Sequence, residues 1–131
     1  MEGQGSKRAH LPPISEQMKA WSAALAAELS DWPQVTQKSF FGFTALHRGK
    51  KMFALLPRTR SVFQGNAIAF RLEQAGHSTR SGIERDRRIS AFDKDKTRWF
   101  TFELSTNSDL RDALEYLAMA FEGARTPKKN K

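Results

Sequence analysis

The stretch from Val35 to Leu72 constrains the fold of this chain more than any other. It consists of short runs rich in β-branched, aromatic and aliphatic residues, separated by glycine, proline and basic residues. Such runs are typical of strands joined by tight turns. We expect strands over residues 35–40, 44–48, 52–56 and 67–72. Gly42 stands at one of the breaks, where glycine can take a positive φ angle and the chain can turn or bulge, and residues 49–51 are predicted to form a hairpin turn.

Alternation predicts how these strands face their surroundings, because successive side chains point to opposite faces of a sheet. The fourth run is predicted to place Ile68, Phe70 and Leu72 on one face and Ala67, Ala69 and Arg71 on the other. The run 52–56 is almost entirely apolar, which favours a central strand covered on both faces. His47 alternates away from Leu46, and we expect its side chain to be exposed.

Two amphipathic helices are predicted, one before and one after these strands. The first begins at the N-cap candidate Ser15 and ends before Pro33, because proline biases the preceding residue away from the helical region. The second begins after residues 105–108 and ends near Gly123. The apolar stripes are Met18, Trp21, Leu25 and Leu29 in the first helix, and Leu110, Leu114, Leu117 and Phe121 in the second. A fifth strand is expected over residues 98–104.

The sequence between residues 73 and 97 does not predict a single structure. Residues 74–78 have the composition of a loop, and residues 81–89 fit either a short helix or an irregular excursion. Residues 89–92 fit a short strand, and the charged residues 93–96 fit a polar turn.

These elements predict one α+β domain of two layers. A mainly antiparallel sheet of about five strands packs against the N- and C-terminal helices. We place the domain at residues 13–124, between a flexible N-terminal tail at 1–12 and a basic C-terminal tail at 125–131.

One motif carries a family resemblance. Val35-Thr36-x-Lys38-x-Phe40-Phe41-Gly42 is followed, after six residues, by Gly49-Lys50-Lys51-Met52-Phe53-Ala54-Leu55-Leu56. This pattern resembles the N-terminal domain of the bacterial competence regulator TfoX and the wider group of YjbR (MmcQ)-like and YdhG-like domains. The resemblance spans about residues 18–123 and is distinctive over 35–56. Phe43 replaces a second glycine of the family pattern, and Arg48 replaces the aspartate of its turn.

The resemblance implies a small bacterial α+β domain without known catalytic residues. It also suggests DNA binding or transcriptional regulation. The formal charge of +8, from 22 basic and 14 acidic residues, favours polyanionic partners, although a basic surface also serves solubility alone.

The sequence carries no local signature of an active site. It contains no cysteine, which excludes disulfides, cysteine-based zinc sites and a cysteine nucleophile. His10, His47 and His77 have no metal-binding spacing, and the glycines form no phosphate-binding loop. We therefore predict no catalytic residue, no cofactor and no metal, although groups distant in the sequence can still converge. No apolar run is long enough for a membrane span, and we expect a cytoplasmic protein.

Basic residues beside aromatic ones are the strongest functional signal. No Asp or Glu occurs between Val35 and Leu72, whereas the candidate nucleic-acid contacts Lys38, Arg48, Lys50, Lys51, Arg58 and Arg60 all lie there. We predict a non-enzymatic regulatory domain that contacts nucleic acid through the hairpin at 48–51 and the loop at 58–60. Two alternatives stay open. One is a dimerisation or adaptor module that uses the sheet around Trp99 and Thr101, and the other is a small-molecule-binding domain.

Overall fold

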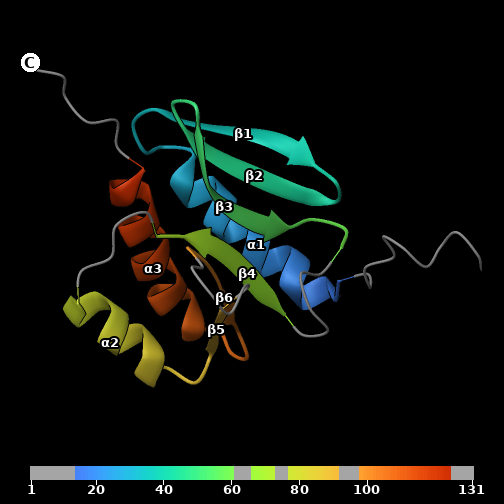
Figure 1. Ribbon diagram of the computed structural model, residues 1–131. Coiled ribbons are helices and arrows are strands. Elements are labelled where there is room, and N and C mark those ends of the chain that lie inside the picture. The colour runs from blue at the N-terminus through green and yellow to red at the C-terminus, as the bar shows by residue number, and fades with distance from the viewer. Residues whose placement is uncertain (1–13, 61–65, 73–76, 92–97, 125–131) are drawn as a thin grey trace, which may run out of the picture.

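The computed structural model describes residues 14–60, 66–72, 77–91 and 98–124. The elements in chain order are α1 (Glu16–Leu29), β1 (Val35–Phe40), β2 (Phe43–Arg48), β3 (Lys51–Pro57), β4 (Ala67–Arg71), α2 (His77–Arg85), β5 (Ile89–Ala91), β6 (Trp99–Glu103) and α3 (Asp109–Gly123) (Figure 1). Within these residues the strands form one antiparallel sheet in the order β1-β2-β3-β4-β6-β5. The predicted α+β fold is confirmed, with six strands rather than about five.

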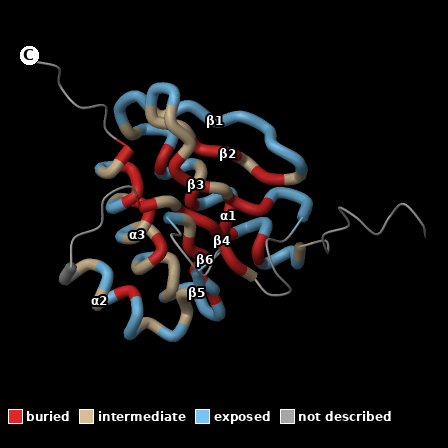
Figure 2. The backbone as a smooth tube through the Cα atoms, in the orientation of Figure 1, coloured by how far each residue is buried: buried red, intermediate tan, exposed pale blue. Residues whose placement is uncertain are grey.

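One face of the sheet packs against α1 and α3 and forms the main core. The strand residues in this core are Leu46, Phe53, Ala54, Leu56, Ile68, Phe70, Phe100 and Phe102. The register agrees, because Ala54 pairs with Phe70 and Phe70 pairs with Phe100, which places all three side chains on the same face. Burial is high along β3 and β4 and low along the edge strand β1 (Figure 2). We call the side toward α1 and α3 the helix face.

A β-bulge interrupts the pairing of β3 with β2, a feature that the sequence did not predict. Leu46 pairs with Ala54 and His47 pairs with Met52, so Phe53 has no partner on β2. The extra residue allows Phe53 and its neighbour Ala54 both to be buried in the core. The ring of Phe53 meets that of Phe121 on α3 edge to face, with centroids 5.7 Å apart.

The helix boundaries follow the predicted signals. The Ser15 side chain accepts a hydrogen bond of 3.0 Å from the Met18 N–H and caps α1. The last helical residue of α3 is Gly123, as predicted. At the start of α3, Ser108 makes no side-chain capping bond, and the Asp109 carboxylate instead accepts hydrogen bonds from the N–H groups of Ser105 and Thr106.

The segment that the sequence left open contains a helix and a strand. Of its two alternatives, the short helix is the one observed, and α2 begins at His77, inside the predicted loop at 74–78. Ile83 attaches this largely polar helix to the core, where it is 4% exposed. The predicted turn at 93–96 and both predicted tails lie outside the described residues. Among the described helices, none is long and apolar enough to cross a bilayer.

A charged network joins the connection between α2 and β5 to α3. The Arg88 guanidinium donates hydrogen bonds to Asp86, Asp109 and Asp112 at 2.9–3.0 Å. It also lies over the ring of Phe102, with Cζ 4.7 Å from the centroid. The Tyr116 hydroxyl donates a 2.7 Å hydrogen bond to Asp86. This arrangement satisfies several polar groups at the margin of the core.

The network shifts the pKa values of several of its members, including Asp86 and Tyr116. The hydrogen bonds from Arg88 lower the pKa of Asp86 to about 2, although burial opposes them. Burial raises the pKa of Tyr116 to about 12, and the hydrogen bond to Asp86 adds to this effect.

The Asp86 pKa predicts how the stability of the protein depends on acid. The folded-state pKa lies below the ordinary value of 3.8, so the ionised carboxylate stabilises the fold above about pH 4. This contribution is lost as the pH falls from about 4 to about 2. We expect Arg88→Met to lower the free energy of unfolding at pH 7 by about 1–2 kcal/mol, because this partly exposed network lies between surface and buried ion pairs. The free energy of unfolding of Arg88→Met should also fall less steeply than that of wild type as the pH is lowered. Urea denaturation at several pH values measures both effects.

The substitution Arg87→Met is a matched control, because Arg87 is exposed and its replacement removes the same charge. Arg87→Met should change the free energy of unfolding by less than about 0.5 kcal/mol. Part of the acid dependence should survive in Arg88→Met, because the backbone N–H groups of Ser105 and Thr106 are the main cause of the lowered pKa of Asp109. Equal pH profiles for wild type and Arg88→Met would contradict the assigned role of Arg88.

Candidate nucleic-acid interface

The connection between β1 and β2 is a two-residue turn with an unusual occupant. Phe40 pairs with Phe43, which leaves Phe41 and Gly42 as the turn residues. Their φ angles are 49° and 90°, and hairpin turns with two positive φ angles ordinarily carry Asn, Asp or Gly at both positions. Phe41 therefore adopts a backbone conformation that its side chain disfavours.

The aromatic rings at this turn project into solvent. Phe41 is 83% exposed and Phe40 is 38% exposed, whereas Phe43 on the following strand is buried. The Phe40 and Phe41 rings meet edge to face, with centroids 4.9 Å apart. The sequence did not predict the exposure of this pair, which emerges only in the structure.

The carbonyl of Gly42 fastens the loop after β3 to this turn. It accepts hydrogen bonds from the N–H groups of Arg58, Thr59 and Arg60 at 2.9, 2.9 and 3.3 Å. The Arg60 side chain lies directly against Gly42, where a Cβ atom would come within 2.6 Å of its Cγ. The turn thus holds the backbone of two arginines next to Gly42, the residue that follows Phe41.

Five residues make up what we call the turn cluster: Lys38, Phe40, Phe41, Arg58 and Arg60. Lys38 is exposed on β1 and shares a sheet face with Phe40, two residues along the strand. Arg58 donates a 3.3 Å hydrogen bond to Ser39 from the neighbouring loop. Two of the six predicted nucleic-acid contacts, Arg58 and Arg60, therefore lie at this end of the sheet, and Lys38 lies two residues along β1 on the face opposite the Ser39 side chain that Arg58 contacts.

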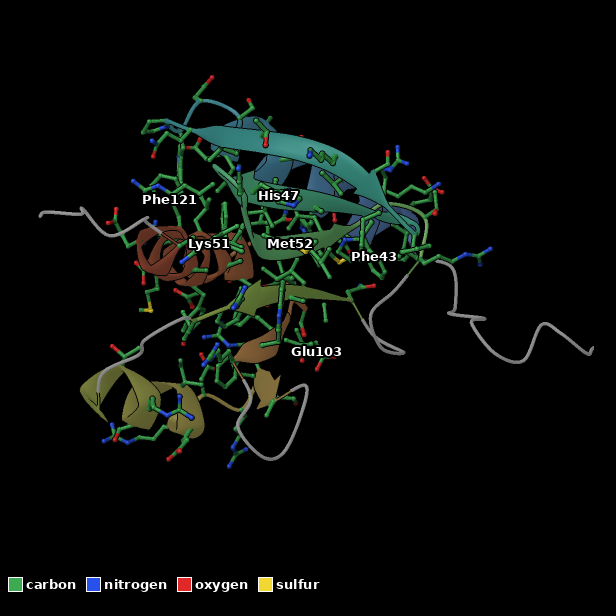
Figure 3. The ribbon with its side chains drawn as sticks, turned by 45° about the horizontal axis from the view of Figure 1, so that its top comes forward. Phe43, His47, Lys51, Met52, Glu103 and Phe121 are labelled. Carbon is green, nitrogen blue, oxygen red and sulfur yellow. The ribbon has the colours of Figure 1, made fainter. Side chains whose placement is uncertain are left out.

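The other three predicted contacts lie at the opposite end of β3. Arg48 pairs with Lys51 across the Gly49–Lys50 turn, whereas Arg58 follows the last residue of β3. The seven residues of β3 span roughly 20 Å. Lys51 and Phe43, labelled in Figure 3, mark these two ends. The predicted hairpin and loop therefore do not form one continuous patch.

Arg48 is engaged within the fold. Its Cζ lies 4.0 Å from the centroid of the Phe121 ring, and its Nη1 donates a 2.9 Å hydrogen bond to the Phe121 carbonyl. Its Nε donates to the Gln34 side chain at 3.0 Å. These contacts join the β2–β3 hairpin to the end of α3, which gives Arg48 a structural role that its sequence position did not indicate.

His47 differs from its predicted exposure, because it is half-buried. It lies on the sheet face opposite the helix face, and its buried Nδ1 has no hydrogen-bond partner among the described residues. Burial, and then the positive charge of Lys38, lower the pKa of His47. In the described ranges, no group of three or more His, Cys, Asp or Glu residues is arranged to hold a metal ion.

Comparisons with models of protein families, with curated protein sequences and with solved structures find no match to this chain. Any function of the turn cluster is therefore inferred from its own geometry. The turn cluster offers positive charge, exposed aromatic surface and a backbone held by hydrogen bonds, which are features suited to binding a ligand.

The contacts of Arg48 predict that it contributes to stability. Arg48→Ala removes a cation–π contact and two hydrogen bonds, and we expect it to lower the free energy of unfolding by about 1–2 kcal/mol. Lys50→Ala removes the same charge from an exposed turn position and should change it by less than about 0.5 kcal/mol. Urea denaturation of the two variants compares them directly, and equal values would argue against the structural role of Arg48.

The geometry of Gly42 predicts a similar contrast between two glycines. Gly42→Ala forces a positive φ on alanine and a contact with Arg60, which should cost about 1–3 kcal/mol of unfolding free energy. Gly82 lies within α2 with open space at its Cβ position, so Gly82→Ala should stabilise the protein by up to about 1 kcal/mol. Thermal denaturation with calorimetry separates the two. A Gly42→Ala protein as stable as wild type would mean that the turn has another conformation.

Proposed function

We propose that this chain is a cytoplasmic, non-enzymatic regulatory domain that contacts nucleic acid through the turn cluster. The observation that carries this proposal is an exposed aromatic pair at one end of a sheet, with Arg58 and Arg60 on a loop bonded to the same turn and Lys38 two residues along β1. The resemblance to TfoX N-terminal, YjbR-like and YdhG-like domains supports the same assignment. The proposal is narrower than the prediction from sequence, because it uses one end of the sheet.

Electrostatics support a phosphate-bearing ligand. The three cations lie in a stretch of 38 residues, from Val35 to Leu72, without a single carboxylate side chain. The whole chain carries a formal charge of +8. Positive charge in such surroundings attracts polyanions and releases their counterions on binding, which strengthens binding as salt is lowered.

The proposed interface includes only one end of β3, and the hairpin at the other end lies outside it. Lys51 lies roughly 20 Å from Arg58 along β3, so only a ligand of about that length reaches from the hairpin to the loop after β3. Arg48 is held against Phe121 and belongs to the fold. The hairpin lysines therefore serve as the natural comparison for the cations of the turn cluster.

The proposal predicts a specific salt dependence. Fluorescence anisotropy with labelled 20-nucleotide single strands and 20-base-pair duplexes, repeated over a range of salt concentrations, gives the slope of log Kd against log salt. Lys38→Gln, Arg58→Gln and Arg60→Gln together should reduce the magnitude of this slope by about 2–3, because each phosphate contact contributes about 0.7–0.9. Binding should weaken most at low salt.

The control removes charge from the other end of the sheet. Lys50→Gln with Lys51→Gln should leave both the slope and the affinity close to those of wild type. Circular dichroism and urea denaturation must show both variants folded. If wild type fails to bind either nucleic acid even at low salt, the proposed function is wrong. If the hairpin variant loses more affinity than the turn-cluster variant, the interface lies at the other end.

A further inference from the structure

We infer that the turn cluster selects single-stranded nucleic acid, with the Phe41 ring stacked on an unpaired base. The inference rests on the proposed function and names its ligand class. Phe41 combines two features that do not favour the folded chain by themselves: a positive φ angle and an 83% exposed ring. A glycine at this position would satisfy the turn without either cost.

The surroundings hold the Phe41 ring in place without covering it. The edge-to-face contact with Phe40, at an interplanar angle of 74°, restrains the ring from one side. The three hydrogen bonds to the Gly42 carbonyl fix the backbone on which it stands. An aromatic surface fixed in solvent is the kind of platform on which nucleic-acid bases stack.

The combination of ring and charge favours an unpaired strand over a duplex. In a duplex the faces of the bases are already covered by their neighbours, so an exposed ring gains little there. In a single strand a base can turn onto the ring while the backbone follows the cations, as in proteins that bind single strands without sequence preference. Lys38, Arg58 and Arg60 supply that charge on the elements that flank the ring.

A second copy of this chain is the competing occupant for an exposed phenylalanine. The charges oppose it, because two turn clusters brought face to face would place three cations against three others. The same charges favour a polyanion. Self-association through Phe41 is therefore the less favourable alternative, and the experiment below detects it.

The test compares Phe41→Gly with Phe41→Trp. The glycine variant removes the ring and relaxes the positive φ angle, so it should fold at least as stably as wild type. The tryptophan variant keeps an aromatic surface. Anisotropy at one low salt concentration uses a labelled 20-mer of deoxythymidine, an abasic strand of the same length and a 20-base-pair duplex.

We expect wild type to bind the thymidine strand more tightly than the abasic strand or the duplex. Phe41→Gly should weaken binding to the thymidine strand about tenfold, the effect of one lost base stack, while binding to the other two ligands stays the same. Phe41→Trp should retain the preference. A loss confined to the ligand with unpaired bases cannot come from a change in charge.

Three other results would overturn the inference, and each has a distinct meaning. If Phe41→Gly weakens binding to all three ligands equally, or to none, Phe41 does not stack on bases, and the proposed function survives without it. If no ligand binds wild type at low salt, the proposed function itself fails. If light scattering shows that Phe41→Gly converts a dimer into a monomer while the ligand preferences stay unchanged, the exposed ring belongs to a contact between two copies of the chain.

Discussion

The packing of α1 and α3 on one face of the sheet is the interaction on which the rest of this structure depends. Phe121 illustrates it, because its ring meets those of Trp32 and Phe53 and also supports the guanidinium of Arg48. Each large apolar side chain buried in such a layer contributes about 1.5–3 kcal/mol. Because the helices cover the inner strands, the edge strand β1 stays exposed, and the turn at its end projects away from the core.

Two arginines show why net charge is a poor guide to the surface that a partner meets. Arg88 binds three carboxylates above the Phe102 ring, and Arg48 lies on the Phe121 ring and donates to its carbonyl. Both residues join elements that are distant in the sequence. Their charge is largely used within the fold, whereas Lys38 on β1 and Lys50 in the β2–β3 turn are exposed. The position of a cation therefore matters more than the total of +8.

The candidate site depends on a backbone feature rather than on a cluster of reactive groups. Gly42 supplies a positive φ angle and a carbonyl that accepts three N–H groups, which fastens the loop after β3 to the hairpin. Phe41 is the other residue of the turn, and its positive φ angle is energetically unfavourable. Strained residues of this kind persist where the surrounding structure holds them, and they are frequent at binding sites. Here the surrounding bonds position aromatic and basic side chains together.

The sequence by itself determined most of the strands, the Ser15 cap and the end of α3, because alternation, turn residues and capping signals act between near neighbours along the chain. It also named all three cations of the turn cluster. Only the tertiary structure decided that they lie apart from Lys50 and Lys51, that Phe53 occupies a bulge, and that Arg88 joins the connection between α2 and β5 to α3. These features depend on which strands pair and in what register, and pairing brings together residues whose separation along the chain carries no local signal.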